Sequence, residues 1–252
     1  MKKILTIKNL RKIYHTKNAE ILAVDDFSFD LYEGEFVSIV GPSGCGKSTV
    51  LSILSGLLDK SEGQIKYNDN IKFGYMLQND SLFPFRNIVD NCMIGLEISK
   101  EKTVENEKYV IDLLNTYGLK EFIHSFPENL SGGMRQRCAL IRTLACKPDV
   151  LLLDEPFSAL DYQSRLAVSD DVYKIIKKEK KSAIMVTHDL AEPISPINMT
   201  PYLYPYVIRI LSNKKKVFTF LVFIKLNIYY FRYSIFFIFI FIHYHYFFNK
   251  LS

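Results

Sequence analysis

Residues 41–49 read Gly41, Pro42, Ser43, Gly44, Cys45, Gly46, Lys47, Ser48 and Thr49, and this stretch decides the fold. It matches the phosphate-binding pattern G-x-x-x-x-G-K-[ST]. Glycine lets the backbone curve closely around a phosphate, and the amides of such a loop then point inward at a helix N-terminus. We therefore expect the loop to bind the phosphates of a nucleotide. The alternative is a tight glycine-rich turn without a ligand.

The two flanks of this loop favour nucleotide binding. The apolar run Phe36–Val40 predicts a buried strand that leads into the loop, and Ser48–Leu58 predicts a helix that leads out of it. In this context Lys47 is placed to hold the β- and γ-phosphates, and Ser48 is placed to bind Mg²⁺.

A second apolar run, at residues 150–153, ends in the acids Asp154 and Glu155. Two carboxylates at the end of a buried strand are costly without a cation or another partner. In an open α/β sheet the carboxyl ends of the strands face the ligand crevice. We interpret Asp154 as the acid that supports Mg²⁺ and Glu155 as the base that polarises an attacking water. His188 ends another predicted strand at the same edge, although a lone histidine there is more often structural.

Three further positions have a structural interpretation, and two of them, Tyr14 and Ser131, have a functional one as well. Tyr14, expected between the first two strands, is either an aromatic platform for adenine or an ordinary half-buried tyrosine. Gln78 follows a short strand, where a glutamine is usually a surface turn residue. Ser131 can cap a helix that runs to about Cys146. That helix N-terminus either faces a second phosphate or only begins an amphipathic helix.

Hydrophobic periodicity along the chain predicts an α/β fold. We expect strands at residues 4–10, 21–32, 36–40, 63–67, 71–76, 150–153 and 183–187, and helices at 48–58, 88–98, 103–117, 131–146 and 162–181.

In their order along the chain, these motifs resemble the nucleotide-binding subunits of ATP-binding cassette (ABC) transporters. The Walker A loop alone would indicate only a P-loop NTPase. The runs L-S-G-G-M-R-Q-R and L-L-L-D-E-P-F-S-A-L-D are specific for the ABC family. The resemblance covers about residues 1–190 and consists of the Walker A loop, the Q-loop residue Gln78, the signature at 130–133, Walker B at 151–155, the D-loop at 158–161 and the switch residue His188.

The resemblance implies a P-loop NTPase (RecA-like) core with an antiparallel β subdomain and an inserted α-helical signature subdomain. The ATPase domain is expected at residues 1–190, with the helical subdomain at about 80–146. ATP and Mg²⁺ are the implied ligands, and ATP hydrolysis is the implied activity.

The resemblance also assigns roles to single residues. Tyr14 would stack on adenine, Gln78 would sense Mg²⁺ and the attacking water, and His188 would hold the γ-phosphate. Ser131, Gly132 and Gly133 would contact the γ-phosphate of ATP bound to the opposite subunit. The expected sets are Glu155, His188 and Gln78 for catalysis; Tyr14, residues 41–49, Ser131, Gly132 and Gly133 for ATP; and Ser48, Gln78 and Asp154 for Mg²⁺.

The implied partners are a second ATP-binding subunit, giving a head-to-tail homodimer, and transmembrane permease subunits. An extracytoplasmic solute-binding protein would act indirectly, and the chain would lie peripherally at the cytoplasmic face of the cell membrane. The segment Gly74–Cys92 looks like the branch that imports nitrate, sulfonates and taurine.

The main competing function is a soluble ABC ATPase that acts on ribosomes or DNA. Such proteins usually carry two cassettes or a long coiled-coil insertion, and this chain has one cassette and no such insertion. The first 190 residues hold 25 basic and 26 acidic residues, so no nucleic-acid partner is expected.

Residues 191–252 depart from the family pattern. Pro193 stands where a helix should continue, and the remainder is rich in Phe, Ile and Tyr. One interpretation is a membrane segment at Ser234–Phe248, but a span needs roughly 20 residues. A second is a strand-rich end packed on the core, and Val207–Ser212 has some strand character. The abrupt loss of the family pattern favours a third interpretation, which is out-of-frame translation from about codon 193. Under this interpretation the chain could also be a disabled remnant, which is a further alternative function.

Overall fold

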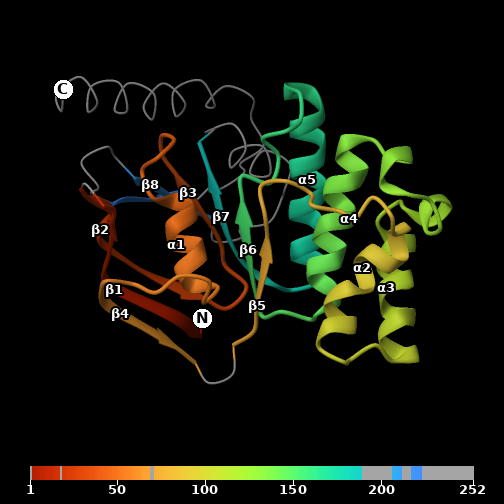
Figure 1. Ribbon diagram of the computed structural model, residues 1–252, viewed down its shortest axis with the longest axis horizontal. Helices are drawn as coiled ribbons and strands as arrows, with labels where there is room; N and C mark the ends of the chain where they lie inside the picture. The colour runs from red at the N-terminus through yellow and green to blue at the C-terminus, as the bar shows by residue number, and fades with distance from the viewer. Residues whose placement is uncertain (1, 18, 69–70, 189–205, 212–216, 223–252) are drawn as a thin grey trace, which may run out of the picture. The chain divides into compact units, whose positions relative to one another are not determined.

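The computed structural model describes residues 2–17, 19–68, 71–188, 206–211 and 217–222, and for the last two segments only the backbone. All of these residues belong to one compact unit of the chain. Within it, the structure has the α/β architecture that the sequence predicts, with an antiparallel sheet, a mainly parallel sheet and a group of helices (Figure 1).

An antiparallel sheet forms one layer, with the strand order β2-β1-β4. Alternating apolar residues in these strands point toward one face, where Leu5, Ile7 and Phe27 are buried. The strands are β1 (Lys3–His15), β2 (Glu20–Tyr32) and β4 (Glu62–Tyr67).

The second sheet has the order β5-β6-β7-β3-β8-β9 in the described part of the chain. All neighbouring strands are parallel except β8 and β9, which are antiparallel. Every residue of β3, β6 and β7 is buried, as expected for parallel strands covered on both faces. The strands are β3 (Phe36–Val40), β5 (Phe73–Met76), β6 (Val150–Asp154), β7 (Ser182–Thr187), β8 (Tyr206–Leu211) and β9 (Val217–Val222).

The main hydrophobic core lies between the two sheets, around helix α1 (Lys47–Leu54). Val50 and Leu51 of α1 are fully buried and belong to the same cluster as side chains of β1, β3 and β6. This packing fixes α1 at the carboxyl edge of the parallel sheet, so the phosphate loop that precedes it is fixed as well (Figure 1).

A group of helices follows β5 in the chain. Helices α2, α3 and α4 contact one another, and α4 also contacts β5 and α5. Asn87, Thr103, Ser131 and Asp161 cap α2, α3, α4 and α5 through side-chain oxygens. The helices are α2 (Ile88–Ile98), α3 (Val104–Thr116), α4 (Gly132–Ala145) and α5 (Tyr162–Lys178), with short 3₁₀ turns η1 (Lys120–Phe122) and η2 (Pro127–Asn129).

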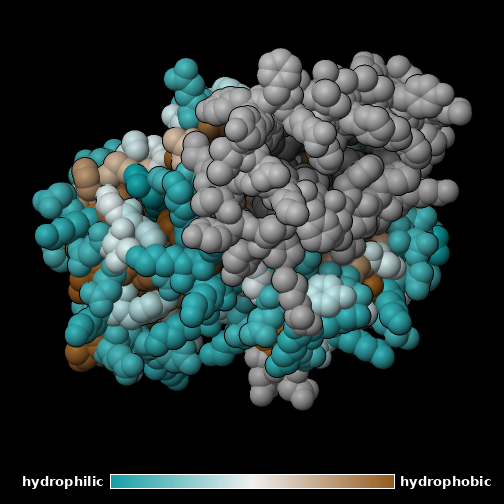
Figure 2. Space-filling model, turned by 180° about the vertical axis from the view of Figure 1, so that it is seen from behind, coloured by the Kyte–Doolittle hydropathy of each residue, from teal (hydrophilic) through white to brown (hydrophobic). Residues whose placement is uncertain are grey.

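Among the described residues, no helix is both long and apolar enough to cross a membrane. On the face shown in Figure 2, the coloured surface is mostly hydrophilic, and hydrophobic residues appear only in small separate areas.

Strands β8 and β9 come from the segment beyond the predicted domain boundary. The backbone of β8 runs parallel to β3, with Phe36 opposite Tyr206 and Val40 opposite Ile210. The core sheet therefore includes strands from beyond residue 190. The predicted boundary itself, the region around Pro193 and the segment Ser234–Phe248 lie outside the described residues, so the interpretations of the tail stay predictions.

Candidate functional site

The phosphate loop joins β3 to α1 by a left-handed turn. Gly44 has φ +77° and Gly46 has φ +98°, conformations that L-residues rarely adopt. A Cβ atom on Gly46 would also lie 2.2 Å from the carbonyl oxygen of Ala23. The loop is closed by a bond from the Gly41 amide to the Thr187 carbonyl (3.2 Å) and by one from the Cys45 amide to the Pro42 carbonyl (3.3 Å). At Gly46 only glycine fits, because both the positive φ and the close approach of Ala23 exclude a side chain.

Lys47 begins α1 and turns its ammonium group back into the loop. Its Nζ donates to the carbonyl oxygens of Gly41 (2.8 Å) and Pro42 (3.1 Å), and lies 3.7 Å from Glu155 Oε1. The lysine side chain is only 4% exposed. A buried cation held by neutral carbonyls and one carboxylate can also attract the oxygens of a phosphate.

Ser48 and Asp154 meet beside the lysine. Ser48 Oγ donates to Asp154 Oδ1 across 2.8 Å, and Tyr75 of β5 donates from its hydroxyl to Asp154 Oδ2 across 3.0 Å. Burial and the nearby negative charge of Asp154 raise the pKa of Tyr75 to about 12. Tyr75 was not among the residues that the sequence motifs indicated.

The donor set fits Mg²⁺. This ion prefers hard oxygen ligands and is usually held by one or two carboxylates together with substrate phosphates. In the described residues no three His, Cys, Asp or Glu side chains group together as a metal site. The hydroxyl of Ser48 and the carboxylate of Asp154 would therefore hold the ion together with the nucleotide.

Glu155 lies at the centre of the predicted catalytic residues. Its Oε2 is 3.0 Å from His188 Nδ1 and 3.4 Å from Gln78 Nε2. Gln78 Nε2 also reaches Ser158 Oγ at 3.3 Å. The backbone of Glu155 has φ +43°, which is strained for a residue with a Cβ atom, and its amide donates to the Val186 carbonyl (2.9 Å). The strand ends thus bring together three side chains that are far apart in the sequence.

Tyr14 lies inside β1, so its predicted place between the first two strands was wrong. The pairing of Tyr14 with Ile21 continues the β1–β2 ladder to His15 and Glu20. The ring is 37% exposed, and its hydroxyl lies 3.4 Å from Thr49 Oγ1. Lys12 Nζ is 5.3 Å from the ring centroid. The structure therefore places an exposed aromatic ring beside the helix that begins at the phosphate loop.

The predicted signature residues lie at the start of α4. Ser131 Oγ accepts from the Met134 amide at 3.3 Å. A Cβ atom on Gly132 would lie 2.8 Å from Leu160, and one on Gly133 would lie 2.6 Å from Val168. In the described part of the chain, no hydrogen bond joins these residues to the phosphate loop. The single chain therefore brings together the residues predicted for phosphate binding, Mg²⁺ binding and catalysis, but leaves the predicted signature residues apart from them.

The sequence matches the family model described as "ABC transporter" over residues 24–158. It is 44% identical over 199 residues to an uncharacterized ABC transporter ATP-binding protein, YtlC, of Bacillus subtilis, covering 76% of each chain. It is also 40% identical over 178 residues to the taurine import ATP-binding protein TauB of Rhizobium johnstonii, covering 68% of each chain.

Among solved structures, the chain is similar to MJ0796, an ATP-binding cassette solved as a dimer in a post-hydrolysis state bound to ADP and Pi. The TM-score is 0.65 and the identity is 30%, with 83% of this chain and 94% of the other covered. A putative metal-chelate type ABC transporter in an inward-facing conformation shares the fold, with a TM-score of 0.71, 24% identity, and coverage of 87% and 83%.

Proposed function

The chain belongs to the ATP-binding subunits of ABC transporters, and we propose that the site around Glu155 hydrolyses ATP to drive the import of a small anion. The observation that carries the proposal is the position of Glu155, which touches a phosphate-loop lysine, the Q-loop glutamine and the switch histidine at once.

Each group has a task that follows from its position. The loop amides and Lys47 bind the β- and γ-phosphates, because they supply donors and a positive charge at a helix N-terminus. Mg²⁺ held by Ser48 and Asp154, with Gln78 nearby, would neutralise charge on the phosphate oxygens. The exposed ring of Tyr14 offers a stacking surface for adenine.

Glu155 acts as the general base. Its carboxylate accepts the proton of a water that attacks the γ-phosphate, while His188 and Gln78 orient the two reactants. Lys47 Nζ lies 3.7 Å from Glu155 Oε1 in this arrangement, so the group that binds the phosphates and the base are side by side. His188 adds a donor for a phosphate oxygen.

The working site requires two copies of the chain. Ser131, Gly132 and Gly133 present an accessible helix N-terminus, which favours a phosphate brought from outside the chain. We propose a head-to-tail homodimer in which these residues contact the ATP held by the partner's phosphate loop. The similar cassette MJ0796, which was solved as a dimer, supports an assembly of two copies.

The permease subunits are proposed to dock next to Gln78. Leu77, Phe83 and Phe85 are 46%, 37% and 73% exposed, and the rings of Phe83 and Phe85 lie 5.6 Å apart. We call Phe83 and Phe85, whose rings are neighbours, the apolar patch. Apolar side chains grouped on a surface often mark a protein interface. Since the patch lies close in sequence to Gln78, a movement there can reach the catalytic carboxylate.

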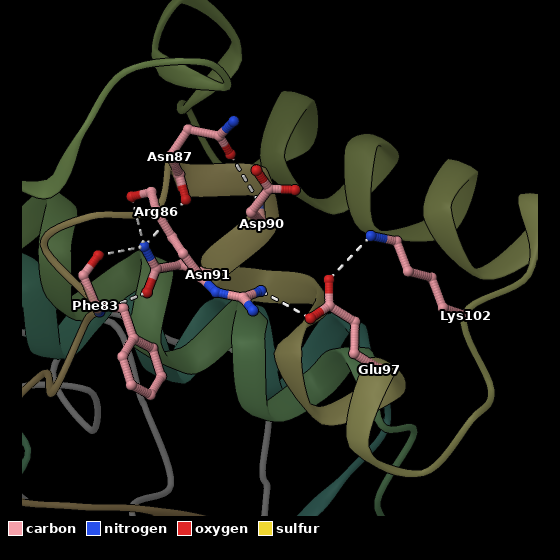
Figure 3. A network of polar contacts seen from close by, with 7 residues as sticks. All are labelled: Phe83, Arg86, Asn87, Asp90, Asn91, Glu97 and Lys102. Carbon is pink, nitrogen blue, oxygen red and sulfur yellow. Dashed lines mark hydrogen bonds and ion pairs between the residues drawn. The ribbon is translucent and has the colours of Figure 1, made fainter.

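A buried asparagine holds the loop that carries this patch (Figure 3). Asn91 is fully buried in α2. Its Oδ1 accepts from the Phe83 amide (2.7 Å), and its Nδ2 donates to the carbonyls of Phe83 (3.0 Å), Arg86 (2.9 Å) and Asn87 (3.0 Å). One side chain thus contacts four backbone groups, with its two N–H donors shared among three carbonyls, and ties the loop to α2, which suits a surface that must transmit force.

The taurine import relatives favour nitrate, a sulfonate or taurine as the transported anion. The chain also resembles an Fe(3+) ions import ATP-binding protein of Haemophilus influenzae at 36% identity over 204 residues. The transported substrate is therefore selected by the membrane subunits and by an extracytoplasmic solute-binding protein, which acts on this chain indirectly. The chain itself would lie at the cytoplasmic face of the membrane.

Hydrolysis is tested with Glu155→Gln. This variant keeps the shape of the side chain and removes the base, so we expect ATP binding within about twofold of the original and turnover lower by about 10²–10⁴-fold. Phosphate release and the binding of a fluorescent nucleotide measure the two effects. Glu107→Gln, at an exposed position in α3, is the matched control. Near-normal turnover of Glu155→Gln would exclude Glu155 as the base.

Transport is tested in proteoliposomes that contain the chain, its cognate permease subunits and their solute-binding protein. We expect taurine, a sulfonate or nitrate to stimulate hydrolysis and to accumulate inside. Stimulation by Fe(III) and by none of these anions would contradict the proposed substrate class while leaving the ATPase assignment intact.

A further inference from the structure

We propose that Tyr75 is a positioning residue that orients Asp154 for Mg²⁺, a role that lies outside the motifs of the sequence. This inference rests on the proposed function, because it concerns the cation of the same site. Three contacts carry it: Tyr75 to Asp154, Ser48 to Asp154, and Gln78 to Glu155.

The sheet register places the tyrosine where it can reach the carboxylate. β5 runs parallel to β6, with Tyr75 opposite Leu152. From there the phenol extends toward the carboxyl edge of the sheet, and its hydroxyl donates to Asp154 Oδ2 at 3.0 Å. Asp154 is only 7% exposed, so water has little access to supply a substitute donor. Tyr75 is half-buried beside it.

The two oxygens of Asp154 therefore have different partners. Tyr75 holds Oδ2, while Oδ1 lies 2.8 Å from Ser48 Oγ. The terminal torsion of a carboxylate is broad and nearly two-fold, so a free Asp154 could turn its oxygens away. Two donors from two different elements fix the plane of the group. Oδ1 then stays beside the serine hydroxyl that would share the ion with it.

The same strand also supplies the other carboxylate with a donor. Gln78 follows Tyr75 by three positions and contacts Glu155 Oε2 at 3.4 Å. Strand β5 and the segment directly after it therefore contact both acids of the site, Asp154 through Tyr75 and Glu155 through Gln78. Groups behind the ligands of a metal commonly change its affinity by about 10–100-fold when removed. Loss of a single phenol hydroxyl should weaken the binding of the ion by about tenfold, near the lower limit of this range.

The test is the substitution Tyr75→Phe in the full chain. Mn²⁺, a stand-in for Mg²⁺, is titrated into the protein with a non-hydrolysable ATP analogue kept below the protein concentration. The free ion is followed by electron paramagnetic resonance. We expect the dissociation constant of Mn²⁺ to rise by about tenfold. Nucleotide affinity in EDTA should stay within about twofold. Turnover at saturating Mg²⁺ should recover to within about threefold, as expected of a positioning residue.

Tyr117→Phe is the matched control. Tyr117 is a half-buried tyrosine whose hydroxyl donates to a carboxylate, Glu179 Oε1, at 2.6 Å, and it lies in the helical part of the chain. This variant should bind Mn²⁺ like the original protein. An unchanged Mn²⁺ affinity in Tyr75→Phe would overturn the proposal. So would an equal loss of nucleotide affinity with and without the cation, because that result indicates a general structural effect.

The result is separable from the proposed function. If the unaltered protein binds Mn²⁺ and nucleotide but hydrolyses no ATP with its permease subunits, the proposed function fails. The Mn²⁺ titration of Tyr75→Phe still reports on the orientation of Asp154 in that case. If hydrolysis is normal and Tyr75→Phe binds Mn²⁺ with the same affinity as the original protein, the proposed function stands and only the role of Tyr75 fails.

Discussion

Arg135 Nε donates to Asp80 Oδ2 across 3.0 Å and thereby joins helix α4 to the segment that follows Gln78. Arg142 of the same helix donates to the carbonyl oxygens of Asp80 (2.6 Å) and Ser81 (2.7 Å). The helix that begins with the proposed signature residues therefore also holds the segment leading to the apolar patch. A displacement at the proposed permease contact would therefore reach the proposed dimer contact through these bonds.

The Asp80–Arg135 pair should be measurable as a coupling in stability. Both side chains are about one-third exposed, at 29% and 36%, so we expect a coupling of about 0.5–1 kcal/mol in a double-mutant cycle of Asp80→Ala and Arg135→Ala. Urea unfolding of the four proteins measures it. Arg135→Ala also loses the hydrogen bond to the Leu130 carbonyl. This contribution cancels in the cycle, because both proteins with Arg135→Ala lack that bond. Strict additivity of the two changes would show that the contact carries no coupling.

Asn91→Ala should destabilise the chain strongly. The change removes the side-chain partner of the Phe83 amide and of the Arg86 carbonyl, whereas the carbonyls of Phe83 and Asn87 keep the backbone amides of Arg86 and Asn91 as donors. Two backbone groups without a partner beside a fully buried side chain predict a loss of about 2–4 kcal/mol in the free energy of unfolding. Chemical denaturation gives this value. Asn115→Ala, at an exposed position in α3, should stay within about 0.5 kcal/mol. Similar values for the two variants would contradict the role of Asn91 in holding the loop.

Gly46→Ala should cost far more than Gly44→Ala. Both residues have positive φ, so each alanine carries a backbone cost of about 1 kcal/mol. A Cβ atom at Gly46 would in addition lie 2.2 Å from the Ala23 carbonyl, whereas one at Gly44 meets nothing within 4 Å. We expect at least about 2 kcal/mol more loss for Gly46→Ala in thermal unfolding. Equal melting temperatures for the two variants would show that β2 moves to make room for the methyl group, and would contradict this prediction.

Glu97→Gln should change how stability depends on pH (Figure 3). Hydrogen bonds from Lys102 (2.9 Å) and Arg86 (2.7 Å) hold the pKa of Glu97 below its usual value of 4.5. A lowered folded-state pKa means that the stabilisation is present above pH 4.5 and is lost as the pH falls through the folded-state value. The variant should therefore be less stable at pH 7 and should lose less stability between pH 5 and pH 3.

The control for Glu97→Gln is Glu121→Gln, at an exposed position in η1. Denaturation of the three proteins across this pH range separates the local ion pair from the general effect of one fewer acid. If the free energy of unfolding of Glu97→Gln changes with pH as steeply as that of the original protein, the lowered pKa of Glu97 does not stabilise the fold.

Most elements of the fold could be predicted because their sequences are locally consistent. Phe36–Val40 is apolar except for Ser38, and the structure buries all five residues in a parallel strand. Ser131 was expected to cap a helix, and its Oγ accepts from the Met134 amide. The prediction erred at element ends. β1 continues past Leu10 to His15 and takes in Tyr14, because pairing with β2 extends a strand whose own sequence no longer alternates.

The sequence alone determined the loop at residues 41–49, the order of the motifs and the ABC family, because these depend on residue types at fixed spacing. It could not show that Tyr75 reaches Asp154 or that Asn91 holds the Phe83–Asn87 loop. Those contacts depend on the register between neighbouring strands and on the turn before α2. They form only when segments far apart in the chain pack together, and a side chain then acquires a partner that no local pattern contains.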